Sequence, residues 1–201
     1  MARAAQRHRA TMRRSIGLLT LLAALAVSVL SEPRAASASE DAPWNALRRG
    51  AVVLFRHAIA PGVGDPSGMR LDDCATQRNL DAAGRRQAIG IGEAFRAKDI
   101  PVGAVLTSEW CRARDTAELA FPGRAAAEPI FNSFFGDRST AAAQTDAARA
   151  VLLGWRGPGA LVVSTHQVNI TALTGIVPAS GEGVVLEARD DTLTVIGRVR
   201  P

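Results

Sequence analysis

The sequence is poor in the residues that build metal centres and nucleic-acid-binding surfaces. Its 201 residues include no tyrosine, two cysteines and three histidines. The cysteines, Cys74 and Cys111, do not form a C-x-x-C pair and make no recognisable zinc set, so we expect neither a metal nor a cofactor. The three Trp and six Phe residues are accompanied by no basic stripe, which argues against a stacking surface for nucleic acid.

Two catalytic motifs are also absent. The chain has no G-x-S-x-G, which counts against a serine hydrolase of the α/β-hydrolase kind. The segment PGVGDPSG, residues 61–68, lacks the G-K-[ST] ending of a phosphate-binding P-loop. It belongs to a 23-residue loop, Ala58–Leu80, and loops of this length are often functional. We therefore expect a lid that carries Arg70 or Arg78 toward a substrate, with a surface salt bridge as the alternative role of Arg78.

The longest apolar run lies near the N-terminus and is short for a membrane-spanning helix. It extends over 15 residues, Ile16–Leu30, follows five arginines and precedes Ala36-Ser37-Ala38. This is the layout of a secretory signal peptide. We therefore expect cleavage after residue 38, one domain over residues 39–201, and a periplasmic or secreted protein without stable membrane association. An uncleaved membrane anchor is the alternative.

The basic character of the whole chain comes from this N-terminal segment. The sequence carries 24 Lys and Arg against 19 Asp and Glu. Residues 1–38 hold six of the basic residues and one acidic residue, so residues 39–201 carry 18 of each sign. This balance gives no reason to expect nucleic acid or an anionic membrane as a partner.

The two cysteines lie in the part of the chain that we expect to be exported. A disulfide can persist in an oxidising compartment, so Cys74 and Cys111 either form one bridge or remain partly buried free thiols. If they are bonded, the bridge ties the Ala58–Leu80 loop to the segment that carries Arg112.

Apolar runs alternate with helical patterns along the rest of the chain. Short runs rich in β-branched residues predict buried strands at Ala51–Phe55, Val102–Leu106 and Ala160–Ser164. Apolar spacings of three and four predict helices at Asp81–Lys98, Trp110–Ala120 and Ala141–Leu153. A closing hairpin is predicted from two further strands, Gly183–Arg189 and Leu193–Val199. Strands that alternate with helices predict an α/β fold with a largely parallel sheet.

Each of the three buried strands is followed by a polar cluster. The clusters are Arg56-His57 after the first strand, Ser108-Glu109 with Arg112 after the second, and Thr165-His166-Gln167 after the third. Ligands of open α/β sheets bind beyond the carboxyl ends of the strands, so we expect the clusters to converge in one crevice. Residues 39–201 contain two histidines, and both occupy these positions.

Two arginines and two histidines around one point suit a phosphoryl group. The guanidinium group matches the oxygens of a phosphate in a bidentate manner and stays charged at any working pH. An imidazole can attack phosphorus and pass the phosphoryl group on to water, which divides one slow step into two. Attack requires the neutral ring, and nearby guanidinium charges favour that form.

Four ordered stretches resemble the histidine phosphatase superfamily, also called phosphoglycerate mutase-like. The stretches are FRHA at 55–58, NLDAAGRRQA at 79–88, SEWCRARDTA at 108–117 and VVSTHQ at 162–167. The resemblance covers nearly all of residues 39–201 and indicates a small, exported member of the superfamily. It implies a three-layer α/β/α sandwich with a mostly parallel central sheet and a metal-independent phosphatase.

The resemblance also implies the roles of individual residues. His57 is the expected phosphorylated nucleophile, and Arg56, Arg112 and His166 are expected to bind the transferred phosphoryl group. By position, Arg78 and Glu109 are further candidates for substrate contact. The chain departs from the superfamily at the group that protonates the leaving oxygen. Ser133 stands where many members have Glu, and Gln167 stands where others have Asp directly after the second histidine.

The proton donor therefore has three candidates by position, Asp137, Glu109 and Glu128. Asp137 is preferred because it follows the FNSFFG stretch that we expect near the crevice, although each carboxylate can equally be a solvated surface group. A leaving group that is itself a weak base needs no donor. We expect an exported phosphatase of a small phosphomonoester, with an envelope sugar phosphate as one candidate. A catalytically weak phosphoryl-binding or scaffold protein is the alternative, and no oligomeric state is predicted.

Overall fold

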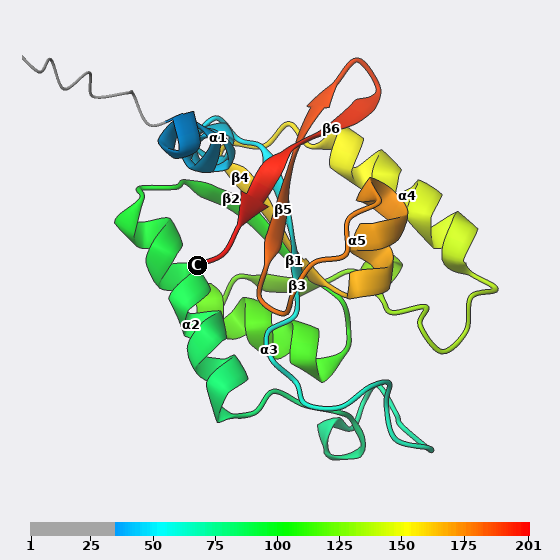
Figure 1. Cartoon of the computed structure of the whole chain (residues 1–201). Coiled ribbons are helices and arrows are strands. Elements are labelled where there is room, and N and C mark those ends of the chain that lie inside the picture. Colours follow the sequence, from blue (N-terminus) through cyan, green and yellow to red (C-terminus); the bar gives the residue numbers. More distant parts are fainter. Residues whose placement is uncertain (1–34) are drawn as a thin grey trace, which may run out of the picture. The chain divides into compact units, whose positions relative to one another are not determined.

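The computed structural model describes residues 35–201, which are drawn in colour in Figure 1. Most of the predicted signal peptide, residues 1–34, lies outside the described residues. Its last four residues begin helix α1, Ala35–Arg48, so the predicted boundary after residue 38 falls within this helix and stays a prediction. Within the described range, no helix is both long and apolar enough to cross a membrane.

A six-stranded mixed sheet forms the middle layer, with the strand order β3-β2-β4-β1-β5-β6. The strands are β1 Val52–Arg56, β2 Val102–Thr107, β3 Ala125–Ala127, β4 Ala160–Thr165, β5 Gly183–Arg189 and β6 Thr192–Val199. The strands β1 to β4 pair in parallel with one another, whereas β5 is antiparallel to both β1 and β6. In the β1–β4 pair, Arg56 lies opposite Thr165. The predicted strands and closing hairpin are confirmed.

Helices cover both faces of the sheet because its central strands are apolar on both faces. Along β1, Val53 and Phe55 pack into a cluster with α1, α2 (Ala82–Ala97) and α3 (Cys111–Ala120). Val52 and Leu54 point to the other face and pack into a cluster with α4 (Ala141–Gly154) and α5 (Gln167–Thr174). Figure 1 shows the two groups of helices on either side of the strands. The predicted three-layer α/β/α sandwich is therefore confirmed.

Three elements go beyond the sequence-based prediction. Helix α1 overlaps the predicted cleavage boundary, and α5 is short and contains several β-branched residues, which have low helix propensity. Strand β3 consists of three alanines that pair in parallel with the end of β2. Strand β3 and helix α5 form because tertiary contacts outweigh the weak local preference of their residues.

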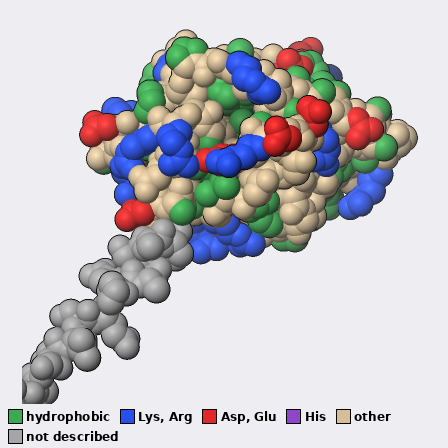
Figure 2. All heavy atoms as spheres, turned by 90° about the horizontal axis from the view of Figure 1, so that it is seen from above, with side chains coloured by type: hydrophobic (Ala, Val, Ile, Leu, Met, Phe, Trp, Pro, Cys, Tyr) green, Lys and Arg blue, Asp and Glu red, His purple; other side chains and the backbone are tan. Residues whose placement is uncertain are grey.

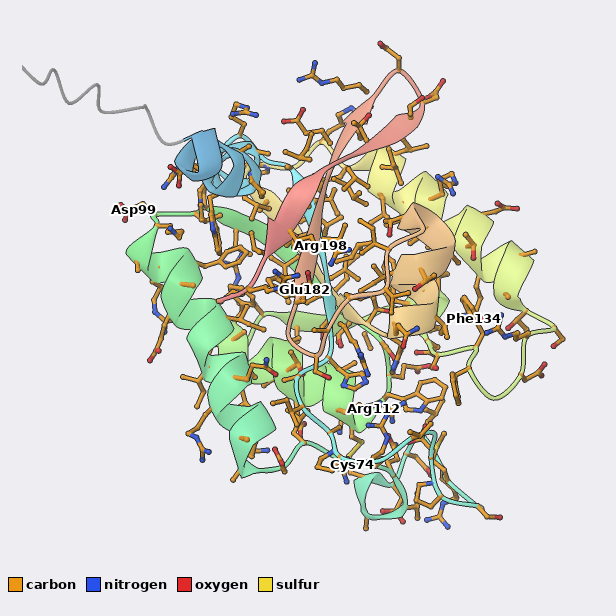
Figure 3. The ribbon with its side chains drawn as sticks, viewed as in Figure 1. Cys74, Asp99, Arg112, Phe134, Glu182 and Arg198 are labelled. Atoms are coloured by element: carbon orange, nitrogen blue, oxygen red, sulfur yellow. A yellow bond between two sulfur atoms is a disulfide. The ribbon has the colours of Figure 1, made fainter. Side chains whose placement is uncertain are left out.

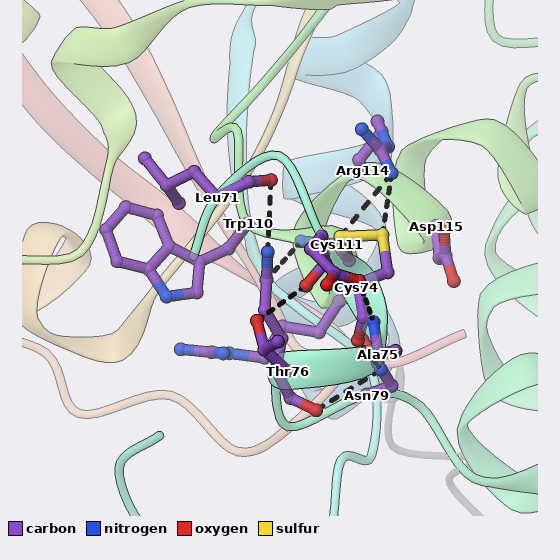
Figure 4. Close-up of a disulfide and its surroundings, with 12 residues drawn as sticks. Leu71, Cys74, Ala75, Thr76, Asn79, Trp110, Cys111, Arg114 and Asp115 are labelled. Carbon is purple, nitrogen blue, oxygen red and sulfur yellow. Dashed lines mark hydrogen bonds between the residues drawn. A yellow bond between two sulfur atoms is a disulfide. The ribbon is translucent and has the colours of Figure 1, made fainter. Parts of the chain in front are cut away.

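The predicted long loop is held by a disulfide and by side-chain hydrogen bonds. Cys74 lies in a short 3-10 helix, η1 (Cys74–Thr76), and is bonded to Cys111 at the start of α3, 37 residues later (Figure 4). The bonded alternative for the two cysteines is therefore confirmed. Gln77 is buried beside the bridge, where its Nε2 donates to Arg70 O at 2.8 Å and its Oε1 accepts from Cys111 N at 3.0 Å.

Charge is distributed differently at the two ends of the sheet. Figure 2 views the end that carries the β5–β6 turn, where basic and acidic side chains lie next to one another. Glu187 pairs there with Arg49 at 2.8 Å and with Arg189 at 2.9 Å. At the opposite end, where β1, β2 and β4 finish, three arginines line one cavity.

Candidate active site

The carboxyl ends of the parallel strands open into a cavity of about 750 Å³. Its lining includes six of the predicted site residues: Arg56, His57, Arg78, Arg112, Asp137 and His166. Arg112 lies at this end of the molecule, above the loop that carries Cys74 (Figure 3). The parallel strands thus bring together residues from the three predicted clusters, which are far apart in the sequence.

His57 directly follows β1 and is held as a neutral ring with one free nitrogen. Its side chain is almost fully buried, and its Nδ1 lies 2.8 Å from the carbonyl oxygen of Ala58. A carbonyl only accepts hydrogen bonds, so Nδ1 carries the proton and Nε2 carries the lone pair. Burial, together with the charges of Arg112, Arg78 and Arg56, lowers the pKa of His57 to about 3. The imidazole is therefore an available nucleophile at neutral and mildly acidic pH.

His166 follows β4 and lies beside His57, with 5.5 Å between the ring centroids. Its Nε2 is hydrogen-bonded to the hydroxyl of Ser108 at 2.8 Å, and the ring of Trp110 stacks edge-on against it at 5.4 Å. Burial holds the pKa of His166 well below its usual value, and Arg112 adds to this effect. The second histidine is thus neutral and fixed in orientation.

Arg112 is the most enclosed of the three arginines. It lies in the first turn of α3, and 3% of its side chain is exposed. Its Nη1 and Nη2 both donate to the carboxylate of Asp65, at 2.6 and 3.1 Å. Within the described residues, Arg112 Nε is buried without a hydrogen-bond partner. A buried guanidinium with an unpaired donor is well suited to an anionic ligand.

Arg56 ends β1 and is positioned by the segment before β5. Its Nη1 donates to Pro178 O at 3.1 Å, and its own Nε is a second buried donor that has no partner in the described part of the chain. Glu182 fixes this segment, because its carboxylate accepts from Ala179 N at 2.7 Å and from Arg198 at 3.2 Å (Figure 3). Burial lowers the pKa of Arg56, and the charge of Arg112 lowers it further.

Arg78 lines the cavity but also holds the loop before it. Its Nε donates to Gly64 O at 2.7 Å and its Nη1 donates to Ala60 O. Burial lowers the pKa of Arg78, as do the nearby charges of Arg112 and Arg56. Arg78 thus combines a position at the cavity wall with a structural role in the Ala58–Leu80 loop. Its predicted contact with substrate stays a prediction, and it forms no surface salt bridge with any of residues 35–201.

Two residues of the recognised motifs hold the backbone that follows His57. Thr116 on α3 accepts from Ala58 N at 2.9 Å, and Gln87 on α2 accepts from Ile59 N at 3.1 Å. Gly84, in the first turn of α2, allows the same segment to approach, since a Cβ at this position would lie 1.9 Å from Ile59 O. The sequence motifs therefore include residues that position the backbone after His57 as well as residues that line the cavity.

The three predicted proton donors differ in their position relative to the cavity. Glu109 Oε2 accepts from Asn132 Nδ2 at 2.7 Å, and neither Glu109 nor Glu128 is among the residues that line the cavity. Asp137 does line the cavity, but it is exposed and accepts from Ser139 N at 2.9 Å. That hydrogen bond lowers the pKa of Asp137, which favours the ionised form. The roles predicted for Glu109 and Asp137 stay predictions.

Asp65 is the site residue that sequence analysis missed. Besides the two bonds from Arg112, its carboxylate accepts from Trp110 Nε1 at 3.0 Å and from Arg78 N at 3.3 Å. Burial raises the pKa of Asp65, but the hydrogen bonds and charge of Arg112, with the bond from Trp110, lower it overall. The available signal was weak: Asp65 is the one acidic residue within the Gly- and Pro-rich segment 61–68.

Side chains that commonly bind metals do not gather in the described part of the chain. Among these residues, no three His, Cys, Asp or Glu side chains are grouped so that they could hold a metal ion.

Comparison with known proteins identifies the fold. No family model and no curated protein matches the sequence. The structure is similar to that of the protein histidine phosphatase SixA complexed with tungstate, with a TM-score of 0.55 and 16% identity over 75% of this chain and 96% of that one. A mycobacterial glucosyl-3-phosphoglycerate phosphatase has a TM-score of 0.54 and 16% identity over 73% of this chain and 96% of that one. Phosphoglycerate mutase from Thermus thermophilus has a TM-score of 0.51 and 17% identity over 74% of this chain and 98% of that one. The predicted phosphoglycerate mutase-like fold is therefore confirmed.

Proposed function

We propose that this protein is a phosphatase that hydrolyses a small phosphomonoester through a phosphohistidine on His57. The observation that carries the proposal is a neutral, buried His57 with a free Nε2 in a cavity that is also lined by Arg56, Arg112 and His166. The solved phosphatases that share the fold support the same reaction class.

In the first step, Nε2 of His57 attacks the phosphorus and the bond from phosphorus to the leaving oxygen breaks. Arg112 and Arg56 bind the equatorial oxygens, where negative charge is spread in the transition state. The fixed ring of His57 removes the entropic cost of orienting the nucleophile. In the second step, water attacks the phosphohistidine, the bond from nitrogen to phosphorus breaks, and inorganic phosphate leaves.

We further propose that the protein acts outside the cytoplasm. The N-terminal sequence pattern motivates this, and the Cys74–Cys111 disulfide supports it, because structural disulfides persist mainly in oxidising compartments. An envelope sugar phosphate is a substrate consistent with that location. N-terminal sequencing of the protein recovered from its compartment tests the export step. Ser39 is expected as the first residue, and an N-terminus at Met1 or at the residue after it would contradict cleavage.

The reaction is tested by phosphate release from 4-nitrophenyl phosphate between about pH 4 and 8. His57→Ala is expected to lower the rate by about 10⁴-fold or more, because removal of a nucleophile eliminates the covalent route. Urea unfolding of the variant shows whether its fold is retained. A variant that folds and keeps the parent's rate would contradict the proposal. Mass spectrometry after an alkaline quench provides a second test, and it should detect phosphohistidine in the parent but not in His57→Ala.

A second function is favoured by one specific observation. Ser133 and Gln167 both line the cavity, yet neither can donate a carboxylic acid proton at the positions where relatives have acids. A phosphoryl-binding protein with little turnover would show this pattern. Such a protein would bind phosphate at the same cavity and release none from an ester, so the assay above, together with a phosphate-binding titration, separates the two functions.

A further inference from the structure

Asp65 lies where a bound phosphoryl group would compete for the same donors. We propose that Asp65 occupies the guanidinium fork of Arg112 in the resting protein, is displaced from it by the substrate's phosphoryl group, and then donates the proton to the leaving oxygen. This inference rests on the proposed phosphatase function and supplies the proton donor that the superfamily positions lack.

The competition follows from the burial of Arg112. With 3% of its side chain exposed, Arg112 has few directions in which it can meet a ligand, and its two terminal nitrogens both donate to Asp65. A carboxylate and a phosphoryl group bind a guanidinium fork in the same bidentate manner. An ester that binds both terminal nitrogens of Arg112 must therefore replace the carboxylate of Asp65.

The displaced carboxylate has room to move without leaving the site. Asp65 lies in the segment 61–68, where neighbouring Val63 is 89% exposed, while Asp65 itself lines the cavity. Its carboxylate is held by four donors from three residues: the two terminal nitrogens of Arg112, Trp110 Nε1 and Arg78 N. When the bonds from Arg112 are lost, the bond from Trp110 can keep the group beside the ring that packs on His166.

Displacement also changes which form of Asp65 is stable. Burial alone raises the pKa of this carboxyl group, and the hydrogen bond and charge of Arg112, followed by the hydrogen bonds from Trp110 and Arg78, lower it overall. Once Arg112 binds the phosphoryl group instead, its hydrogen bonds to Asp65, the largest of the influences that oppose burial, are lost and a negative charge is added nearby. Both changes favour the protonated acid, which is the form that a proton donor requires.

Asp65 takes up one proton from solvent when the phosphoryl group displaces its carboxylate from Arg112, and it returns that proton to solvent when the pair with Arg112 forms again. As the bond from His57 Nε2 to phosphorus forms and the bond to the leaving oxygen breaks, the Asp65 carboxyl group gives its proton to that oxygen. In the second step, the carboxylate takes a proton from the attacking water while the bond from nitrogen to phosphorus breaks. The sum is an ester plus water giving an alcohol plus phosphate, with Asp65 and His57 restored.

Two measurements on Asp65→Asn test the proposal in the full protein. The first is the affinity for sulfate, an anion whose charge is constant in the assay range, measured by titration calorimetry. Removal of the competing carboxylate is expected to tighten sulfate binding by about 10-fold, the effect of losing one competing charged contact. Asp72→Asn is the matched control, since Asp72 is an exposed residue of the same loop and does not line the cavity; its sulfate affinity should equal that of the parent.

The second measurement compares a good leaving group, 4-nitrophenyl phosphate, with a poor one, an alkyl phosphate. Asp65→Asn is expected to lose about 10²–10⁴-fold in kcat on the alkyl ester and to lose little on the aryl ester, since a weakly basic leaving group needs no proton. Asp72→Asn should keep the parent's ratio between the two esters. Asp137→Asn tests the rival donor: a selective loss on the alkyl ester in that variant, with none in Asp65→Asn, would overturn the proposal.

The two arms separate the failure of this inference from the failure of the phosphatase function. If the parent hydrolyses neither ester, the phosphatase function fails. Tighter sulfate binding in Asp65→Asn would then still support the exchange at Arg112, but the proton-donor role would be overturned with the reaction. If the parent hydrolyses the aryl ester, unchanged or weaker sulfate binding in Asp65→Asn overturns the exchange, and equal losses on both esters overturn the proton transfer.

Discussion

Removal of the disulfide should destabilise the protein by an amount that depends on the length of the loop that the bridge closes. The bridge joins Cys74 to Cys111, which are 37 residues apart. Closure of a loop of that length in the unfolded chain corresponds to about 4 kcal/mol of stability at 25 °C in the chain-entropy description. The variant Cys74→Ala/Cys111→Ala should therefore unfold at a clearly lower urea concentration than the oxidised parent.

Urea unfolding followed by tryptophan fluorescence measures this difference. Because Cys111 is fully buried, the double variant also loses some packing, so the parent protein reduced by a thiol is the appropriate control. The free energy of unfolding of the reduced parent should be lower than that of the oxidised parent by most of the expected change of about 4 kcal/mol. The double alanine variant should lose a smaller further amount through its missing packing. If the reduced parent unfolds within about 1 kcal/mol of the oxidised one, the argument from loop closure is refuted.

Two further predictions concern the local structure around His57. Gly84→Ala should destabilise the protein by about 3 kcal/mol and impair activity, because a Cβ 1.9 Å from Ile59 O must shift the backbone that follows His57. Gly90→Ala in the same helix, where a Cβ meets nothing within 4 Å, should stabilise by about 1 kcal/mol, and equal effects in the two variants would contradict the steric argument. The low pKa of His57 should make stability fall on acidification, since the unfolded chain takes up a proton near pH 6.5 and the folded chain does so only near pH 3. Between about pH 7 and 5, the parent should lose about 2 kcal/mol more in urea unfolding than His57→Asn does, and identical losses would show that the folded ring is not held neutral.

Much of the architecture was predictable because the strong signals are local. The strands β1, β2 and β4 are short apolar runs buried on both faces, and α2 and α3 present apolar residues to one face at helical spacing. Because these strands are parallel, the residues that follow them had to meet at one edge of the sheet. That rule located Arg56, His57, Arg112 and His166 in one cavity without any knowledge of the loops.

Asp65 could not be located in the same way. Its place in the site depends on the path of a long loop, on a disulfide whose formation the sequence left open, and on pairing with an arginine 47 residues later. The three-residue strand β3 and the helix α5 were missed for a related reason. Their residues have weak or opposite local preferences, and contacts with the completed sheet decide their conformation.

The register between β1 and β4 has a consequence for how such a protein diversifies. Arg56 lies opposite Thr165, so His57 and His166 are each the next residue along two neighbouring strands, and the hydrogen bonds of the sheet set their spacing. The outer wall of the cavity, by contrast, comes from loop residues such as Val63, Met69 and Phe135. Under the proposed function, mutations in these loops can change which phosphate ester is bound while the two imidazoles keep their separation, so substrate recognition and reactivity can evolve independently.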